Sequence, residues 1–408
     1  MKERIMIQQD SQELQSRRRI IFFTVAAVIF LTGSLIRLLF RDMTSLDSEN
    51  FLVPWYQQIQ QGGGFQMLGT QVGDYNILYQ TMIGLFTYLP IPALYAYKLF
   101  SCIFDFLLAV LCSAIVYELT EKKKESKALL TFAAVYLSPI VMLNSAWWAQ
   151  CDVIYTFFGL ASVYYLSKGK DFRAVILYGF ALTFKLQAIF LIPVLLFVIF
   201  YRNKLHLLYV ILIPAVMILL SGGGLIYGRS IIDVFRIYLN QTATYPSVAL
   251  NYPSVWGLLS DVSHLINHLC GENTVSSQLL YQIIKYPAIL MTIGLLAGYM
   301  IYWLKKKPVL NAKTVFYIAF LLAYTCVIML PGMHERYGYT YEILAIIIVF
   351  LSKKTLPLLL TMYSLTLITY VHFLSNCYFI PISVLSVINI IVYIFYAKHI
   401  LTECVTGA

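Results

Sequence analysis

Carboxylates are scarce in this sequence, and a few of them stand where they could do chemistry. The chain has 19 Asp and Glu among 408 residues, and 60% of its residues are hydrophobic. In so apolar a chain each carboxylate is expected to be solvated, paired or functional. The candidates stand where apolar runs begin or end: Asp47, Asp74, Asp152 and Glu335. A carboxylate at such a boundary could act as a general base or bind a polar substrate.

Asp47 is the strongest candidate for a base. It precedes Phe51, Pro54, Trp55 and Tyr56, and Trp and Tyr favour the headgroup level of a bilayer. A carboxylate held there could meet a water-borne acceptor and a lipid-borne donor together. The alternative is that Asp47 simply begins a short helix.

Asp42 is the competing carboxylate, since it is nearer to the end of the preceding apolar run. It neighbours Arg41, so a local ion pair is the simple explanation for it.

Two sequence elements offer cations to a phosphate. Lys185 stands beside Gln187 in an otherwise apolar run, and Arg336 follows His334 and Glu335. Lysine acts as a point charge and arginine as a bidentate fork, and both bind phosphate. The alternative is that Arg336 pairs only with Glu335 or Glu342.

The remaining candidates are polar side chains that adjoin aromatic residues. Asp74-Tyr75-Asn76 ends the first long polar segment, where a solvated turn is the alternative. Interface anchoring explains Trp147 and Trp148, but it does not explain Gln150 and Asp152. No His, Cys and carboxylate set has zinc spacing, and the seven cysteines are dispersed. We therefore expect no cofactor, although Asp47, Asp74 and Asp152 could ligate a divalent cation.

The elements that position these residues are membrane helices. Only 12% of the residues are charged, against about 25% in soluble domains. Apolar runs of about 20 residues, enough to cross a bilayer, recur from Ile20 onward. The sequence predicts an all-α polytopic membrane protein with about twelve spans and interfacial helices in its first loop. We expect one domain, 1–408, with long extracytoplasmic loops at 41–97 and 227–283.

The basic residues predict the orientation. Most of the 29 Lys and Arg fall in short clusters on one side of the predicted spans, which is the positive-inside signature. The clusters include Arg17–Arg19, Lys122–Lys124 with Lys127, Lys168 with Lys170 and Arg173, Arg202 with Lys204, Lys305–Lys307 and Lys353–Lys354. Both termini are then cytoplasmic, the candidate carboxylates face outward, and the protein lies in the plasma membrane. Clusters of this kind do not indicate nucleic-acid binding.

The run from Ala174 to Phe200 is the exception among the predicted spans. A charged residue at its middle, Lys185, is costly within a bilayer. We expect two short helices that meet near the outer surface.

Taken in order, the polar motifs resemble those of the GT-C glycosyltransferases, in particular a bacterial branch related to GPI-anchor mannosyltransferases. The elements that carry the resemblance are Asp47 with Phe51, Pro54 and Trp55; Asp74-Tyr75-Asn76; Trp148-Ala149-Gln150-Cys151-Asp152; Phe184-Lys185-Leu186-Gln187; Asn251 to Gly257; and Met333-His334-Glu335-Arg336-Tyr337. Two departures from the family motifs are Ala149, which replaces a glycine, and Leu186, which replaces a proline. A third is Asn76-Ile77-Leu78, which lacks the family's prolines.

The resemblance implies an inverting transferase that uses a sugar linked through phosphate to a polyprenol. The sugar is a hexose, mannose-like or other, and the acceptor is a glycan, a glycolipid or a cell-wall polymer. By resemblance Asp47 is the base, Lys185, His334 and Arg336 stabilise the leaving phosphate, and Asp74 and Asp152 bind sugar hydroxyls or support the base. The full set of implied substrate-binding residues is Asp74, Tyr75, Asn76, Gln150, Asp152, Lys185, Gln187, His334, Glu335, Arg336 and Tyr337.

Two other functions fit a many-span protein. A transporter should show broken segments at matching midplane positions in two halves, and Pro214 with Gly222–Gly224 has no clear counterpart. A polysaccharide polymerase or ligase should carry a large outer loop rich in Arg and His. The sequence therefore favours a glycosyltransferase over both.

Overall fold

The computed structural model describes residues 2–120, 124–244, 246–260 and 277–406. These residues are nearly all helical and contain no β-strand, and only isolated bridges pair Leu250 and Asn251 with His334. The predicted all-α class is confirmed.

Six described helices are long and apolar enough to cross a membrane, so the polytopic class is also confirmed. They lie in α1 (Lys2–Leu39), α4 (Ala93–Leu119), α14 (Ser277–Lys306), α15 (Ala312–Met329), α17 (Leu356–Ser375) and α18 (Ile382–Thr406). A seventh candidate is a pair bent by 43°, in which α5 (Glu125–Tyr136) is followed by Pro139–Trp147.

The remaining apolar sequence of the described residues forms shorter helices, so the structure shows six or seven long spans there and not about twelve. These are α3 (Ile77–Phe86), α7 (Asp152–Ser167), α8 (Asp171–Phe184), α9 (Ile192–Arg202), α10 (Leu212–Leu220) and α16 (Tyr339–Leu351). A helix of 13 residues such as α16 is about 20 Å long, less than the hydrocarbon core of about 30 Å. An apolar run in a sequence predicts a membrane span. A short helix that is buried against other helices has an equally apolar sequence, so the prediction overcounts the spans.

The core of the bundle lies around α15 and α16. Every residue of α15 from Thr314 to Ile328 is buried, and α15 packs against α7, α9, α14, α16 and α18. These helices cover α15 on several sides, so it has little lipid-facing surface.

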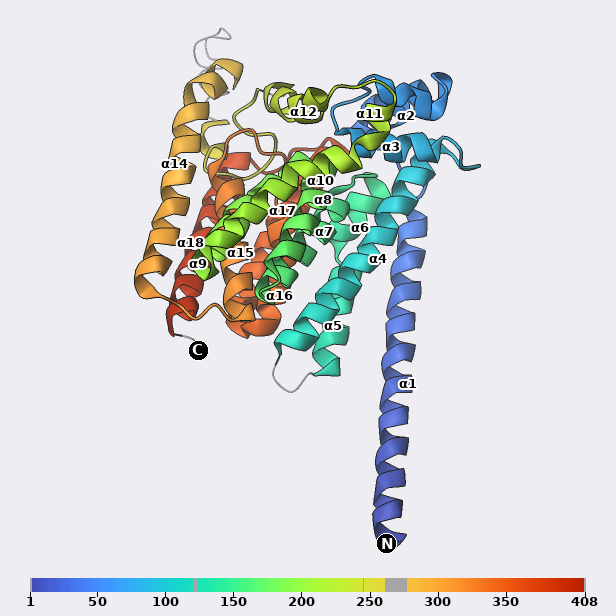
Figure 1. Cartoon of the computed structure of the whole chain (residues 1–408), viewed down its shortest axis with the longest axis vertical. Coiled ribbons are helices and arrows are strands. Elements are labelled where there is room, and N and C mark those ends of the chain that lie inside the picture. Colours follow the sequence, from blue (N-terminus) through green and yellow to red (C-terminus); the bar gives the residue numbers. More distant parts are fainter. Residues whose placement is uncertain (1, 121–123, 245, 261–276, 407–408) are drawn as a thin grey trace.

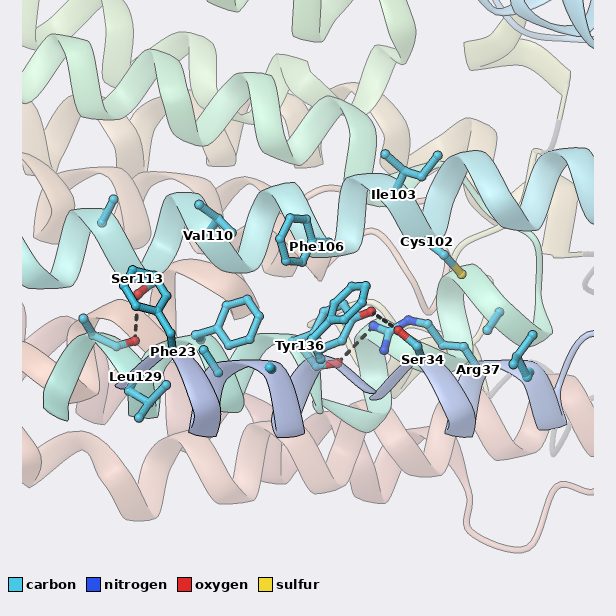
Figure 2. Close-up of a pocket in the computed structure, with 18 of the residues that line it drawn as sticks. Phe23, Ser34, Arg37, Cys102, Ile103, Phe106, Val110, Ser113, Leu129 and Tyr136 are labelled. Carbon is cyan, nitrogen blue, oxygen red and sulfur yellow. Dashed lines mark hydrogen bonds between the residues drawn. The ribbon is translucent and has the colours of Figure 1, made fainter. Parts of the chain in front are cut away.

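Helix α1 stands at the edge of the bundle and extends beyond it (Figure 1). Its apolar residues are largely exposed, as expected for a helix whose solvent is lipid. A groove of about 1380 Å³ separates α1 from α4 and α5. Figure 2 shows apolar side chains such as Phe23, Phe106 and Val110 along this groove, with Arg37 at one end.

Arg37 ties α1 to the bundle. Its Nε donates to Asp105 Oδ2 at 2.9 Å, and Nη2 donates to the Tyr136 carbonyl at 3.0 Å. The same Asp105 oxygen accepts from Ser145 at 2.5 Å. These contacts join α1, α4 and α5 to the segment that precedes Trp148.

Short helices gather at one end of the bundle, here called the cap. The cap comprises α2 (Val53–Gln61), α3, α11 (Gly222–Ile226), α12 (Ile231–Thr244) and their connections, and α18 ends at the opposite end of the bundle (Figure 1).

Both long predicted loops contribute to the cap. Residues 41–97 contain α2 and α3, and the second loop contains α12, although residues 261–276 lie outside the described range. The second loop ends before Ile283, because α14 begins at Ser277. Of the short loop expected around Lys122 and Lys123, residues 121–123 also lie outside the described range.

Candidate active site

A buried lysine fixes the chain that leads to Asp47. Lys98 Nζ donates to the carbonyl oxygens of Phe40, Arg41 and Met43, at 2.7, 3.0 and 2.6 Å. These carbonyls lie just beyond the end of α1 at Leu39, so Lys98 ties the segment that follows α1 to the neighbouring helix α4. The chain beyond α1 therefore leaves in one defined direction.

Asp47 is held through one of its two carboxylate oxygens. Its Oδ2 accepts from Trp148 Nε1 at 2.9 Å and from Gln150 Nε2 at 2.8 Å. Arg336 Nη1 lies 3.6 Å from the same oxygen. Oδ1 accepts no hydrogen bond from any described residue, and the side chain is 17% exposed. Asp47 is therefore oriented and still accessible.

The partners of Asp47 come from an irregular turn. The chain runs through the π-helix η3 (Leu143–Trp147), and Ala149 then adopts φ +60°, in the left-handed region. This conformation favours glycine, which is the residue that Ala149 replaces in the family motif. The turn brings Trp148 and Gln150 to Asp47 before α7 begins at Asp152.

Asp152 is a buried counter-ion. Its Oδ1 lies 2.5 Å from Lys185 Nζ, and its Oδ2 accepts from Asn144 at 3.0 Å. Arg336 Nε lies 3.6 Å from Oδ2. Asp152 thus forms ion pairs with two cations, Lys185 and Arg336. Its side chain is completely buried.

Lys185 stands at the break between two helices, as the sequence predicts. Helix α8 ends at Phe184, Lys185 is extended, and the chain resumes as a 3-10 helix at Leu186. The ammonium lies 5.3 Å from the centre of the Tyr75 ring. The break removes the expected cost of a charge at mid-span, because the charge lies at the helix ends and is paired.

Arg336 joins three carboxylates. Besides Asp47 and Asp152, it reaches Glu335 Oε1 at 3.5 Å, so the pairing with Glu335 considered from sequence does occur. Burial raises the pKa of Glu335 to about 7, although Arg336 opposes the shift.

His334 is neutral at physiological pH. Burial lowers its pKa well below the usual value, and the charges of Arg336 and Lys185 add to the effect. This shift favours the neutral imidazole, which can act as a hydrogen-bonding group.

Nine of the twelve predicted site residues line one cavity of about 590 Å³. They are Asp47, Asp74, Tyr75, Gln150, Lys185, Gln187, His334, Arg336 and Tyr337. Asn76, Asp152 and Glu335 are buried outside its wall. Asn76 instead caps α3 by accepting from the Ile77 amide at 2.5 Å, and it donates to Tyr238 at 2.6 Å.

Two of the three carboxylates considered as ligands of a divalent cation already have other partners in the structure. Asp152 already binds Lys185 and Arg336, and Asp47 accepts from Trp148 and Gln150. In the described part of the chain no three His, Cys, Asp or Glu side chains are arranged to hold an ion.

Residues 75–331 match glycosyltransferase family 87. The chain belongs to this family. It is a GT-C-like membrane glycosyltransferase family, so the resemblance seen in the motifs is confirmed at that level. A comparison with curated proteins finds no match.

The family 87 match covers only part of the site. It includes Gln150, Asp152 and Lys185, but it begins after Asp47 and ends before His334. Those residues join the site through the geometry described above.

This family 87 glycosyltransferase has site residues that sequence reasoning missed. Gln241 of α12 and Tyr281 and Lys285 of α14 also line the cavity. The Gln241 side chain donates to the Asp74 carbonyl. A lone lysine within an apolar segment is a signal that could have identified Lys285. Nothing in the sequence indicated that α12 lies on the site.

Several buried polar atoms of the site lack a hydrogen-bond partner among the described residues. They are Gln150 Oε1, Gln187 Oε1 and Arg336 Nε. Each such atom costs about 1–3 kcal/mol when it stays unpaired. All three atoms are buried behind the cavity wall, so they mark a polar layer that supports the residues lining the cavity.

Proposed function

We propose that this family 87 enzyme is an inverting hexosyltransferase with Asp47 as its base. It transfers a sugar from a polyprenyl-phosphate carrier to a glycan, glycolipid or cell-wall polymer on the outer face of the plasma membrane. The observation that carries the proposal is the state of Asp47. Trp148 and Gln150 fix one oxygen while the carboxylate lines a cavity at the cap.

The proposed reaction is a single displacement at the anomeric carbon. The acceptor hydroxyl gives its proton to Asp47, and its oxygen forms a bond to C1 of the sugar. The bond from C1 to the phosphate oxygen breaks, and its electron pair stays on the phosphate. The products are the glycosylated acceptor and polyprenyl phosphate.

The rest of the cavity wall supports this assignment. Gln150 and Gln187 line the cavity, and their amide groups would hydrogen-bond to the sugar. Asp74, Tyr75 and Tyr337 line the same wall and would complete the sugar site.

The leaving phosphate would meet Lys185 and Arg336, with His334 as a neutral hydrogen-bond partner. Charge that develops on a buried leaving group is stabilised most strongly where water is excluded. Lys185 and Arg336 are both almost completely buried, so they meet this condition. Asp152 and Glu335 would act behind them by holding these cations in place.

Family membership also bears on the other functions. The match of residues 75–331 to a glycosyltransferase family favours an enzyme over a transporter. A polymerase or ligase would use a similar donor, so the acceptor product distinguishes it from the proposed enzyme.

The test is sugar transfer by purified Asp47→Asn beside Asp42→Asn, with a panel of radiolabelled polyprenyl-phosphate sugars. Loss of a general base costs about 10² to 10⁴ in rate, so transfer by Asp47→Asn should fall by that factor while donor binding persists.

Asp42 is the matched control. It is 65% exposed, pairs with Arg41 and accepts from Tyr95, and it does not line the cavity. Its variant should transfer at the wild-type rate. Normal transfer by Asp47→Asn, or a loss confined to Asp42→Asn, would contradict the assignment.

A further inference from the structure

The cations already assigned to the site are largely offset by carboxylates. Lys185 lies 2.5 Å from Asp152, and Arg336 lies within 3.6 Å of Asp47, Asp152 and Glu335. These pairs leave little net positive charge for an anionic substrate.

Lys285 differs from both of them. It lines the same cavity from α14, is half-buried, and makes no ion pair with a described residue. Its ammonium lies near the rings of Tyr281 and Tyr286, whose centres are 5.7 and 6.0 Å from Nζ. Lys285 therefore brings to the cavity wall a charge that no described carboxylate offsets.

Helix α14 connects this charge to the membrane. It lies at the edge of the bundle (Figure 1), and Gln278–Lys306 is long and apolar enough to be a span. Ile283, Leu290 and Ile293 are exposed on it. The helix that carries Lys285 therefore has one side on the cavity and another on lipid.

We propose that Lys285 binds the phosphate of the lipid-linked donor, with the lipid chain running along α14. This inference rests on the proposed function. A sugar phosphodiester carries one negative charge, whereas the phosphomonoester that leaves carries about −1.5 to −2 at neutral pH. Charge therefore grows at the phosphate during transfer, and an unpaired cation stabilises the later state more than the earlier one.

The geometry of inversion favours a cation on a separate element. In an inverting displacement the base and the leaving group lie on opposite faces of the sugar, and in inverting glycosidases the two catalytic carboxyl groups are about 6.5–9.5 Å apart. Arg336 lies 3.6 Å from both Asp47 and Asp152, so it is near the base and also near Lys185, the other cation proposed to meet the phosphate. Lys285 enters the cavity from a different helix and would meet the phosphate from a second direction.

The test is equilibrium binding of polyprenyl phosphate and of the polyprenol of equal chain length to purified full-length protein in detergent. Wild-type protein should prefer the phosphate. Lys285→Met should lose about 10- to 100-fold in affinity for the phosphate, as for one charged hydrogen bond, and should bind the polyprenol unchanged. Lys285→Arg should keep most of the preference.

Arg236→Met is the matched control. Arg236 is a cation on cap helix α12, it is 63% exposed, and it does not line the cavity. Its removal should leave both affinities unchanged.

The outcomes separate the two proposals. If wild-type protein does not distinguish the phosphate from the alcohol, the proposed donor class is wrong. If wild-type and Lys285→Met distinguish them equally, or if Arg236→Met loses as much as Lys285→Met, the assignment of Lys285 is overturned. A rise only in the KM for the acceptor would place the anion on the acceptor and would also overturn it.

Discussion

Three carboxylates and two cations share the centre of the site, so each side chain depends on its neighbours. Arg336 contacts Asp47, Asp152 and Glu335 within 3.6 Å. A buried charge that loses its partner is costly, which makes these residues poor candidates for neutral replacement. Two predictions follow from their geometry and titration.

Arg336→Lys should reduce transfer although it keeps the charge. The guanidinium reaches Asp47 and Asp152 through different nitrogens, whereas a lysine ammonium is a point charge that cannot span both. Loss of one of the two charged hydrogen bonds that the guanidinium would make to the phosphate predicts a fall of about 10- to 100-fold in kcat/KM. Arg236→Lys is the control, and a wild-type rate for Arg336→Lys would exclude a bidentate role.

Glu335 should make stability depend on pH. Burial raises its folded-state pKa to about 7 from 4.5, so the folded protein holds this proton more tightly than the unfolded chain does. The resulting stabilisation of the folded state is complete below about pH 4.5 and is lost as the pH rises through about 7. Its size is at most about 3 kcal/mol.

The measurement is the Tm of wild type and Glu335→Gln in detergent from about pH 5 to about pH 8. The Tm of wild type should fall relative to that of the variant over this range. Parallel curves would show that Glu335 does not titrate there.

At the scale of elements, irregular helices shape the surroundings of Asp47. The π-helix η1 (Ser48–Leu52) begins directly after it, and η3 ends directly before Trp148. Single-turn π-helices are rare in proteins, and those that occur are often found at functional sites. Here they set the directions in which Asp47 and its two hydrogen-bond donors point.

Ala149→Gly should stabilise the protein slightly. Ala149 has φ +60°, a conformation that costs a residue with a Cβ about 1–2 kcal/mol. Glycine relieves that cost but adds entropy to the unfolded chain, about 0.4–1 kcal/mol. We expect a net gain of about 0.5–1 kcal/mol, seen as a Tm higher by about 0.5–1 °C for a chain of this length, with transfer retained.

Ala146→Gly is the matched control for this change. Ala146 is equally buried but lies within η3, where glycine destabilises by about 0.5–1 kcal/mol. Equal destabilisation by both substitutions would show that the turn at Ala149 is not strained.

At the scale of the whole molecule, the candidate site and the basic clusters lie at opposite ends. The cavity is at the cap, whereas α18 ends and α5 begins at the other end (Figure 1). The positive-inside rule predicts that the second end is cytoplasmic.

Cysteine accessibility in intact cells would test this orientation. Glu49 and Ser126 are both exposed, so in a background without the seven native cysteines each can be replaced singly. Glu49→Cys should react with an impermeant maleimide from outside, and Ser126→Cys only after the membrane is opened. The reverse pattern would place the candidate site in the cytoplasm and would contradict the proposed donor.

The class of this protein, and most of the side chains that line its cavity, could be predicted from the residues alone. Long apolar runs require a membrane, and polar residues are so scarce in such a chain that Asp47, Lys185 and Arg336 stand out. The break at Lys185 also followed from the cost of a charge at mid-span.

Which polar residues face the cavity, and which lie behind its wall, depends on how the helices pack and could not be predicted from the motifs. Asp152 and Glu335 are buried as partners of cations, and Asn76 caps α3. In the sequence motifs these three residues cannot be told apart from the polar residues that line the cavity. Lys285 joins the site from a helix more than 200 residues beyond Asp47. The number of long spans was likewise decided by packing. A hydrophobic run indicates that a segment is shielded from water. It does not indicate whether lipid or another helix covers that segment.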